Sequence, residues 1–298
     1  MDESKDSTLN RVYADIKSRK TWENKQRMWY EMRYDGIARF QLPYPNAPDL
    51  HEPLSDTKIN ELKPEYIEQI YSSELLARFI PKKDGIPDDI PMQYAQWFDF
   101  YIKEKTNFED DLVLCFDKML HYGLCTLKII YNLDQKRVYF EAVDPIDFIV
   151  PPYARNLDDL DRCAHSIEIP MSIYKNDDGF NQDEGFIATL SGENADGIDD
   201  DYKRIREGLS SYQKNNDVVI LWECYEKENG KWYVSTWSPF NENTAAKPKS
   251  EIVYNHGKLP FVLFTFEKTD RSYYSSRGVC ELVALEEGVG NKILNHKM

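Results

Sequence analysis

The stretch FEDDLVLCFDKMLHYGLCTLKIIY, residues 108–131, contains the change of pattern that decides the fold class. Its first part is apolar at helical spacing, follows Asn107, which can cap a helix, and begins with acidic residues that favour the positive end of a helix dipole. Gly123 predicts a left-handed helix end. The residues after it, LCTLKIIY, have the composition of a β-strand. The chain therefore passes from helices to strands at Gly123.

Helices are expected on the N-terminal side of this point. One or two amphipathic helices are predicted over 8–34, and the proline-dense segment 41–54 is expected to be an extended connector. A further helix is predicted from Pro64 to Pro81, because Ile67, Tyr71, Leu75 and Phe79 recur every fourth residue. Another is predicted over about 91–106.

Strands are expected on the C-terminal side. Residues 124–143 predict a hairpin with a five-residue loop, and 217–238 predict a second hairpin around Asn229-Gly230, a pair that suits a turn needing positive φ. EIVYN (251–255) and FVLFTFE (261–267) predict two more strands, before a final helix. Helices, then strands, then a helix predict an α+β fold.

The segment VDPIDFIVPPYARNLDDLDRCAHSIEI, residues 143–169, is expected to continue the first sheet, leave it at Pro151 and Pro152, and form a rigid corner between strands. The expected organisation is a helical part over 1–123 and a β-rich part over 124–277, with a mobile acidic insertion near 176–216. The last part, 278–298, is the start of a long helix that we expect to continue beyond Met298.

Composition limits the classes of function. The 298 residues have 41% hydrophobic content and a formal net charge of −15, which disfavours general adhesion to phosphate backbones or anionic membranes. No signal peptide or membrane-spanning stretch is evident, so we expect a soluble protein made inside the cell. The five cysteines are expected to be reduced and buried, because no close pairing is present.

No catalytic, cofactor-binding or metal-binding residue is predicted. The segment with Gly288, Gly290 and Lys292 lacks the spacing of a phosphate-binding loop, and the acidic loop at 196–201 lacks the register of a calcium loop. His121 and Cys125 are interpreted as a structural histidine and a buried thiol, and His165 as a core side chain. Acidic residues near Asp144 and Asp158 leave a carboxylate-dependent carbohydrate hydrolase open as a less favoured alternative.

Segments distributed along the chain resemble the N-terminal part of a tailed-bacteriophage portal protein. The resemblance is one of order and phrasing, and no catalytic signature contributes to it. It is carried by the aromatic, basic N-terminal helix leading to PYPNAPDLHEPLSDTKINEL (43–62), and by DKMLHYGLCTLK (117–128), VDPIDFIVPPYARNLDDLDRCAH (143–165) and SYYSSRGVCELVALEEGVGNKILNHKM (272–298).

The resemblance implies a wing region of a dodecameric ring at the capsid vertex of the virion, made in the host cytoplasm, with no membrane association. Its implied partners are copies of itself, the major capsid protein, the terminase packaging motor and neck or adaptor proteins, with double-stranded DNA as translocated cargo. The stem, with most tunnel-lining and motor-docking residues, would lie beyond Met298. Another neck or baseplate component of the virion is the main alternative.

Subunit contacts are expected in the last segment. We predict that Arg277 anchors its loop against a carboxylate. We expect the polar face of the final helix to line a contact with a neighbouring subunit. The candidate contact residues on this face are Asn291, Lys292, Asn295 and Lys297.

Overall fold

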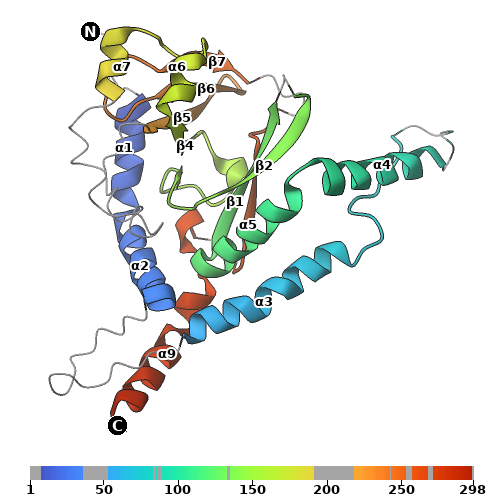
Figure 1. Cartoon of the computed structure of the whole chain (residues 1–298), viewed down its shortest axis with the longest axis vertical. Coiled ribbons are helices and arrows are strands. Elements are labelled where there is room, and N and C mark those ends of the chain that lie inside the picture. The colour runs from blue at the N-terminus through green and yellow to red at the C-terminus, as the bar shows by residue number, and fades with distance from the viewer. Residues whose placement is uncertain are drawn as a thin grey trace. The chain divides into compact units, whose positions relative to one another are not determined.

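The structure is a computed structural model that describes residues 8–35, 53–82, 85, 87, 89–132, 135–190, 218–241, 243–252, 257–267 and 271–296. The fold is α+β, as predicted, with helices preceding antiparallel strands and a helix after them (Figure 1). The chain divides into two compact units. The first comprises Met1–Ser18, Asp147–Ala154 and Asp158–Leu259, and the second comprises Arg19–Ile146, Arg155–Leu157 and Pro260–Met298.

The second unit is built on the hairpin predicted after Gly123. Strand β1 (Leu124–Asn132) lies between β2 (Arg137–Val143) and β8 (Phe261–Thr265) and pairs antiparallel with both. Helix α5 (Phe108–Tyr122) leads into β1 and ends at Gly123, whose φ of +89° is the predicted left-handed stop. Because only glycine adopts this conformation without strain, the helix-to-strand change is fixed at this residue.

The other helices of the second unit surround α5. They are α2 (Lys20–Tyr30), its π-helical continuation η2 (Glu31–Asp35), α3 (Leu54–Tyr71), α4 (Asp89–Lys105) and α9 (Val279–His296). A shared apolar core joins them to the sheet. Its buried members are Ile59, Ile102, Leu112, Cys115, Phe116, Met119, Leu120, Cys125, Leu127, Phe140, Ala142, Val279 and Cys280.

The first unit contains a five-stranded antiparallel sheet. Its order is β3 (Phe148–Ile149), β4 (Arg162–Pro170), β5 (Val218–Glu228), β6 (Lys231–Trp237) and β7 (Lys247–Glu251). The turn between β5 and β6 has Asn229 at φ +50° and Gly230 at φ +80°, so both central residues have the predicted positive φ. The helices of this unit are α1 (Thr8–Ser18), α6 (Met171–Asn176) and α7 (Glu184–Leu190).

Strand β5 is buried on both faces, which explains its continuous apolar sequence. Successive strand residues point to opposite faces. Val219 and Leu221 join a cluster with Phe186 of α7, whereas Trp222 and Cys224 join a different cluster that also contains Leu9 and Val12 of α1, Ile149 and Ala164. Helices therefore cover both faces of the central strand.

Two predicted elements have wrong boundaries. Helix α3 begins at Leu54 and not at Pro64, which lies inside the helix on its exposed side, where water can solvate the carbonyl that a proline leaves unbonded. It ends at Tyr71 and does not reach Pro81; beyond its end the amide of Leu76 donates to Asp99 of α4 at 3.1 Å. Strand β7 is Lys247–Glu251 rather than EIVYN, and 253–256 lie outside the described residues.

Two further predictions about local structure are corrected. Strand β3 does not continue the sheet of β1 and β2; Asp144 accepts a hydrogen bond from the amide of Ile146, and the following strand pairs with β4. The segment 151–161 is nevertheless a corner between two strands. Asn107 does not cap α5, because its side-chain amide is engaged with the backbone of Phe140 in β2, at 2.7 and 2.9 Å.

The predicted acidic insertion is partly packed. Tyr174, Phe180, Phe186 and Leu190 are buried together against β5, so the segment up to 190 belongs to the core of the first unit. The remainder of the predicted insertion lies outside the described residues.

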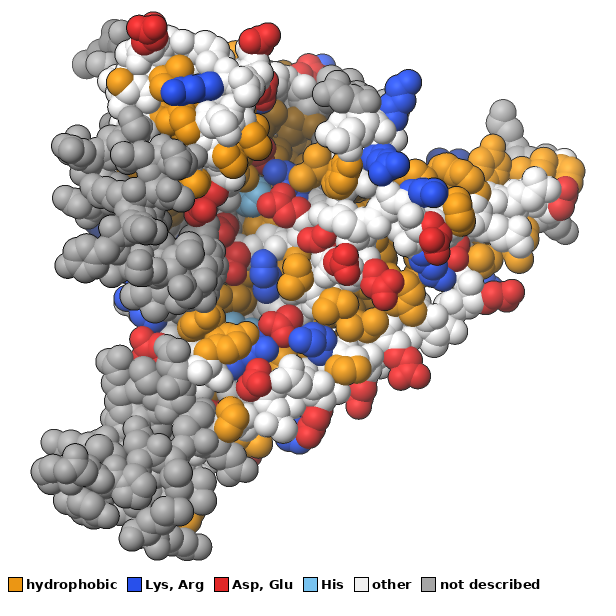
Figure 2. Space-filling view, viewed as in Figure 1, with side chains coloured by type: hydrophobic (Ala, Val, Ile, Leu, Met, Phe, Trp, Pro, Cys, Tyr) orange, Lys and Arg blue, Asp and Glu red, His pale blue; other side chains and the backbone are white. Residues whose placement is uncertain are grey.

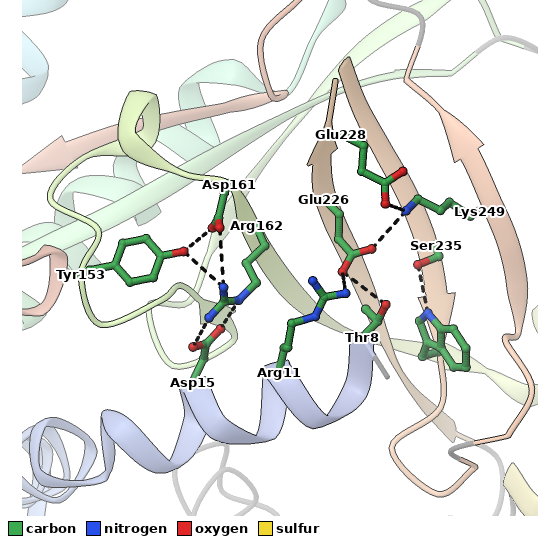
Figure 3. A network of polar contacts seen from close by, with 11 residues as sticks. Thr8, Arg11, Asp15, Tyr153, Asp161, Arg162, Glu226, Glu228, Ser235 and Lys249 are labelled. Carbon is green, nitrogen blue, oxygen red and sulfur yellow. Dashed lines mark hydrogen bonds and ion pairs between the residues drawn. The ribbon is translucent and has the colours of Figure 1, made fainter. Parts of the chain in front are cut away.

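A polar network holds α1 on the sheet of the first unit, as Figure 3 shows. Arg162 of β4 makes a two-pronged ion pair with Asp15 of α1, with both N–O distances 2.9 Å, and Asp15 is 4% exposed. The hydrogen bond from Arg162 to Asp15 helps raise the pKa of the guanidinium. Nearer the N-terminus of α1, Thr8 and Arg11 both contact Glu226 of β5, so polar contacts hold the helix at two places along its length.

Replacing Arg162 with Ala is predicted to destabilise the protein by about 2–5 kcal/mol, because the buried Asp15 carboxylate loses its partner. Replacing Lys231 with Ala is the control, since its ion pair with Glu251 is solvent-exposed and should contribute little to stability. Urea unfolding followed by circular dichroism measures both. Equal midpoints for the two variants would contradict the assignment.

A second, partly buried network joins three elements of the second unit. Arg33 of η2, with a side chain 4% exposed, donates to both oxygens of Asp117 at 3.0 Å and to Asp56 at 2.9 Å, and Lys63 of α3 also contacts Asp117 at 2.9 Å. Desolvation tends to raise the pKa of Asp117, but the bonds from Arg33 and Lys63 outweigh it and lower the pKa below the ordinary value. The ionised carboxylate therefore stabilises the folded state.

This sign sets a pH dependence. The contribution of Asp117 is present above the pKa of an unfolded aspartate, about 3.9, and is lost as the pH falls through that value towards the lower folded pKa. Asp117→Asn should be less stable than the wild type at pH 7, and the difference should shrink below pH ~4. Thermal unfolding from neutral to acidic pH checks this. Curves that stay parallel at every pH would exclude Asp117 as a contributor.

Candidate subunit-contact site

Helix α9 begins where the backbone of Ser276-Arg277-Gly278 packs against the end of α5. A Cβ added to Gly278 would lie 2.6 Å from the carbonyl carbon of His121, and one added to Gly123 would lie 2.5 Å from the carbonyl carbon of Arg277. Real Cβ atoms do not approach other atoms so closely. Two glycines therefore allow the backbone before α9 to touch the α5–β1 junction, and this contact sets the starting point of the helix.

Arg277 precedes Gly278 in the chain, and its backbone lies against Gly123. Its side chain points to a carboxylate. Its Nε and Nη2 atoms donate to the two oxygens of Glu267, each at 2.7 Å. The hydrogen bonds of this pair raise the pKa of Arg277 and lower that of Glu267. Because both side chains are largely exposed, the pair orients the loop more than it stabilises the fold.

The inner face of α9 carries polar groups. Glu287 is 2% exposed and accepts a 2.9 Å hydrogen bond from the amide of Ser55, in the first turn of α3, where a carboxylate is favoured by the helix dipole. Asn291, one turn further, is 1% exposed. The contact of Glu287 with Ser55 holds α9 against α3 in a buried environment, where a polar contact is costly to lose.

Cys280 and His121 form a close pair at the start of this face, with Sγ and Nδ1 3.2 Å apart. Burial is the main cause that raises the pKa of the Cys280 thiol, to about 12, so it is uncharged near neutral pH. A nucleophilic cysteine needs the opposite, a thiolate that a substrate can reach. Cys280 is fully buried, and the pair is therefore structural.

The outer face of α9 carries large apolar side chains beside the exposed Glu286. Leu282, Leu285, Val289 and Ile293 are 44, 79, 47 and 48% exposed, and their spacing of three and four residues places them on one side of the helix. We call these residues the α9 stripe. A surface helix normally buries its apolar side and exposes its polar side. Helix α9 does the reverse at these positions, which is typical of a helix that another surface covers.

The predicted contact residues are only partly located. Asn291 lies on the packed face of α9 and not on an exposed polar face. Lys292 and Asn295 belong to α9 by their backbone, but their side chains lie outside the described residues, as does all of Lys297. Their role in subunit contacts stays a prediction. Sequence reasoning missed the α9 stripe, although its three-and-four spacing was present as a signal.

The residues that could have suggested catalysis or metal binding occupy structural or solvent-exposed positions. His165 is buried, with Nδ1 3.6 Å from Glu223, and His121 pairs with Cys280 instead of Cys125. The side chains of Asp158 and Asp161 are 81 and 59% exposed. Within the part of the chain that the structure describes, no three His, Cys, Asp or Glu side chains gather to hold a metal ion. All five cysteines are free and buried, as predicted.

Comparisons with known proteins find no match for this chain, either among protein-family models or among curated proteins. Among the helices within the described ranges, none has the combination of length and apolar composition needed to cross a bilayer.

Gly278→Ala is predicted to destabilise the second unit by roughly 1–3 kcal/mol, because the added methyl group meets backbone that cannot rotate away. Gly288→Ala is the matched control on the same helix. Its methyl group would meet no atom, and alanine should stabilise the helix by about 0.5–1 kcal/mol. Thermal melts of both variants measure the difference, and two variants shifted in the same direction would contradict the close approach.

Proposed function

We propose that this chain is a structural subunit of a bacteriophage portal ring, the conduit at the capsid vertex through which the genome enters and leaves. The proposal is supported by the resemblance of its sequence phrases to the portal wing. It is also supported by the surface of α9, which carries an apolar stripe outward and buried polar groups inward. The role is mechanical, and the partners are further copies, the capsid protein, the packaging motor and neck proteins.

The α9 stripe is the observation that carries the proposal. Fully burying a large apolar side chain contributes about 1.5–3 kcal/mol, and the four stripe residues are between 44 and 79% exposed. Covering them therefore provides a few kcal/mol at each subunit contact. In a closed ring each subunit makes this contact twice, once with each neighbour.

The net charge of −15 also suits a conduit for DNA. Each lysine or arginine that neutralises a phosphate strengthens the binding of DNA, and a surface with an excess of acidic residues limits this contribution. DNA would then pass as cargo without being held. The carbohydrate hydrolase alternative has less support, because Asp158 and Asp161 are exposed and Asp144 is engaged in a turn.

Light scattering and native mass spectrometry of the full-length gene product test the proposal. We expect a closed oligomer of defined subunit number, a dodecamer by the family resemblance, and weak retention of duplex DNA at physiological salt. A neck or baseplate component would give a different assembly without a DNA-sized channel. A product that stays monomeric at every concentration, and also in the presence of capsid protein, would contradict it.

A further inference from the structure

The outer edge of β8 is unpaired at two residues. The amide of Phe266 donates to the carbonyl of Gly123 before β1, and backbone groups of alternate residues point to opposite sides of an antiparallel strand. The even-numbered residues of β8 therefore face β1, and Leu263 and Thr265 point their amides and carbonyls away from the sheet. Among the described residues, no group bonds to these outward amides and carbonyls. We call this row the β8 edge.

The opposite edge of the same sheet is closed by side chains. Groups from α4, α5 and the loop between them bond to the outward backbone of Val138, Phe140 and Ala142 in β2, at distances of 2.6 to 3.1 Å. The residues that supply these groups are Tyr101, Asn107, Asp111 and Lys118. Because the outward groups of β2 already have partners, a further strand cannot pair there.

The sheet of the first unit also protects its edges. Strand β3 has only two residues, and β7 carries Lys247, Pro248 and Lys249, with a register shift between Val234 and Thr236 of the neighbouring strand. Short length, lysine, proline and bulges are the devices that keep edge strands from pairing with other chains. Strand β8, with the sequence FVLFT, has five residues and neither charge nor proline. It is therefore a template for strand pairing.

Unpaired backbone groups specify their partner more narrowly than exposed apolar side chains do. Helix α4 also exposes large apolar side chains, including Tyr94, Trp97 and Phe100, at the right of Figure 2. Many kinds of apolar surface can cover side chains of this type. Amides and carbonyls at strand spacing are instead matched by another extended backbone with the same spacing. The occupant that fits the β8 edge is therefore a peptide segment in extended conformation.

The side chains beside the β8 edge set the character of that segment. Val262 is 42% exposed, and Phe264 is partly buried against Phe116 of α5, with 5.9 Å between the ring centroids. Val262 and Phe264 lie on the same side of β8, because alternate strand residues share a face. A strand added beside β8 would place every second side chain next to them. The segment should therefore be apolar at alternate positions.

We propose that the β8 edge binds an extended segment of a partner protein, apolar at alternate positions, as an additional strand of the sheet. The backbone of the segment would exchange hydrogen bonds with Leu263 and Thr265. The described strands of a second copy offer no other open edge for this purpose, because β2, β3 and β7 are closed or protected as set out above. The inference goes beyond the proposed ring and does not depend on it.

Hydrogen exchange in the presence of a model strand tests the β8 edge. The probe is the synthetic peptide KTVTVTK, which is apolar at alternate positions. Its control is the same peptide with every backbone amide N-methylated, which keeps the side chains and the charge but removes the backbone donors. In nuclear magnetic resonance spectra of the whole chain, KTVTVTK should slow exchange at the amides of Leu263 and Thr265, and the methylated peptide should not.

Two variants at one position separate the backbone from the side chain. Thr265→Pro removes the outward amide and leaves the bonds to β1 in place, since proline is tolerated on the solvent side of an edge strand, and it should abolish binding of KTVTVTK. Thr265→Val is the matched control, because it keeps the amide and a similar shape, and it should bind as the wild type does. Thr265→Lys, which introduces the type of residue that protects β7, should weaken binding and serves if the proline variant does not fold by circular dichroism.

Three results would overturn the proposal. Unchanged exchange at millimolar KTVTVTK, or equal slowing by both peptides, would show that the β8 edge does not pair with an extended backbone. Full binding by a folded Thr265→Pro variant would place the contact elsewhere. Protection of Leu263 and Thr265 that appears without peptide and rises with protein concentration would show that a second copy, rather than a partner protein, occupies the edge.

Discussion

The contact between the backbone of Gly278 and the end of α5 is the constraint on which the arrangement of the second unit depends. It is possible only because neither Gly278 nor Gly123 has a side chain, and it fixes the residue at which α9 starts. Once the start is fixed, the helical repeat decides which side chains face α3 and α5. Cys280, Glu287 and Asn291 then point inward, and Leu285 points outward.

That orientation has an energetic consequence. The polar residues turned inward have partners supplied by the rest of the unit, such as the Ser55 amide for Glu287, so the helix cannot rotate about its axis without leaving a buried carboxylate unpaired. The apolar residues turned outward are thereby held in water. The fold of one chain thus keeps the α9 stripe exposed, and we propose that an identical neighbour covers it.

The sequence predicted the parts of the fold that depend on neighbouring residues. The helix stop at Gly123 and the Asn229-Gly230 turn are confirmed, because a positive φ strongly selects these residue types. Strand β7 could not be found, since its exposed Lys247–Glu251 segment has no apolar alternation and is held by pairing with β6. The packing of the inner face of α9 was also unpredictable, because Ser55 and His121, the partners of Glu287 and Cys280, are far away in sequence.

A side-chain-resolution electron microscopy map of the assembled full-length protein tests the central claim most directly. We predict a closed ring in which the outer face of α9, with Leu285 near its centre, is covered by a neighbouring subunit. A map in which the outer face of α9 is open to solvent, or is covered by its own chain, would contradict it.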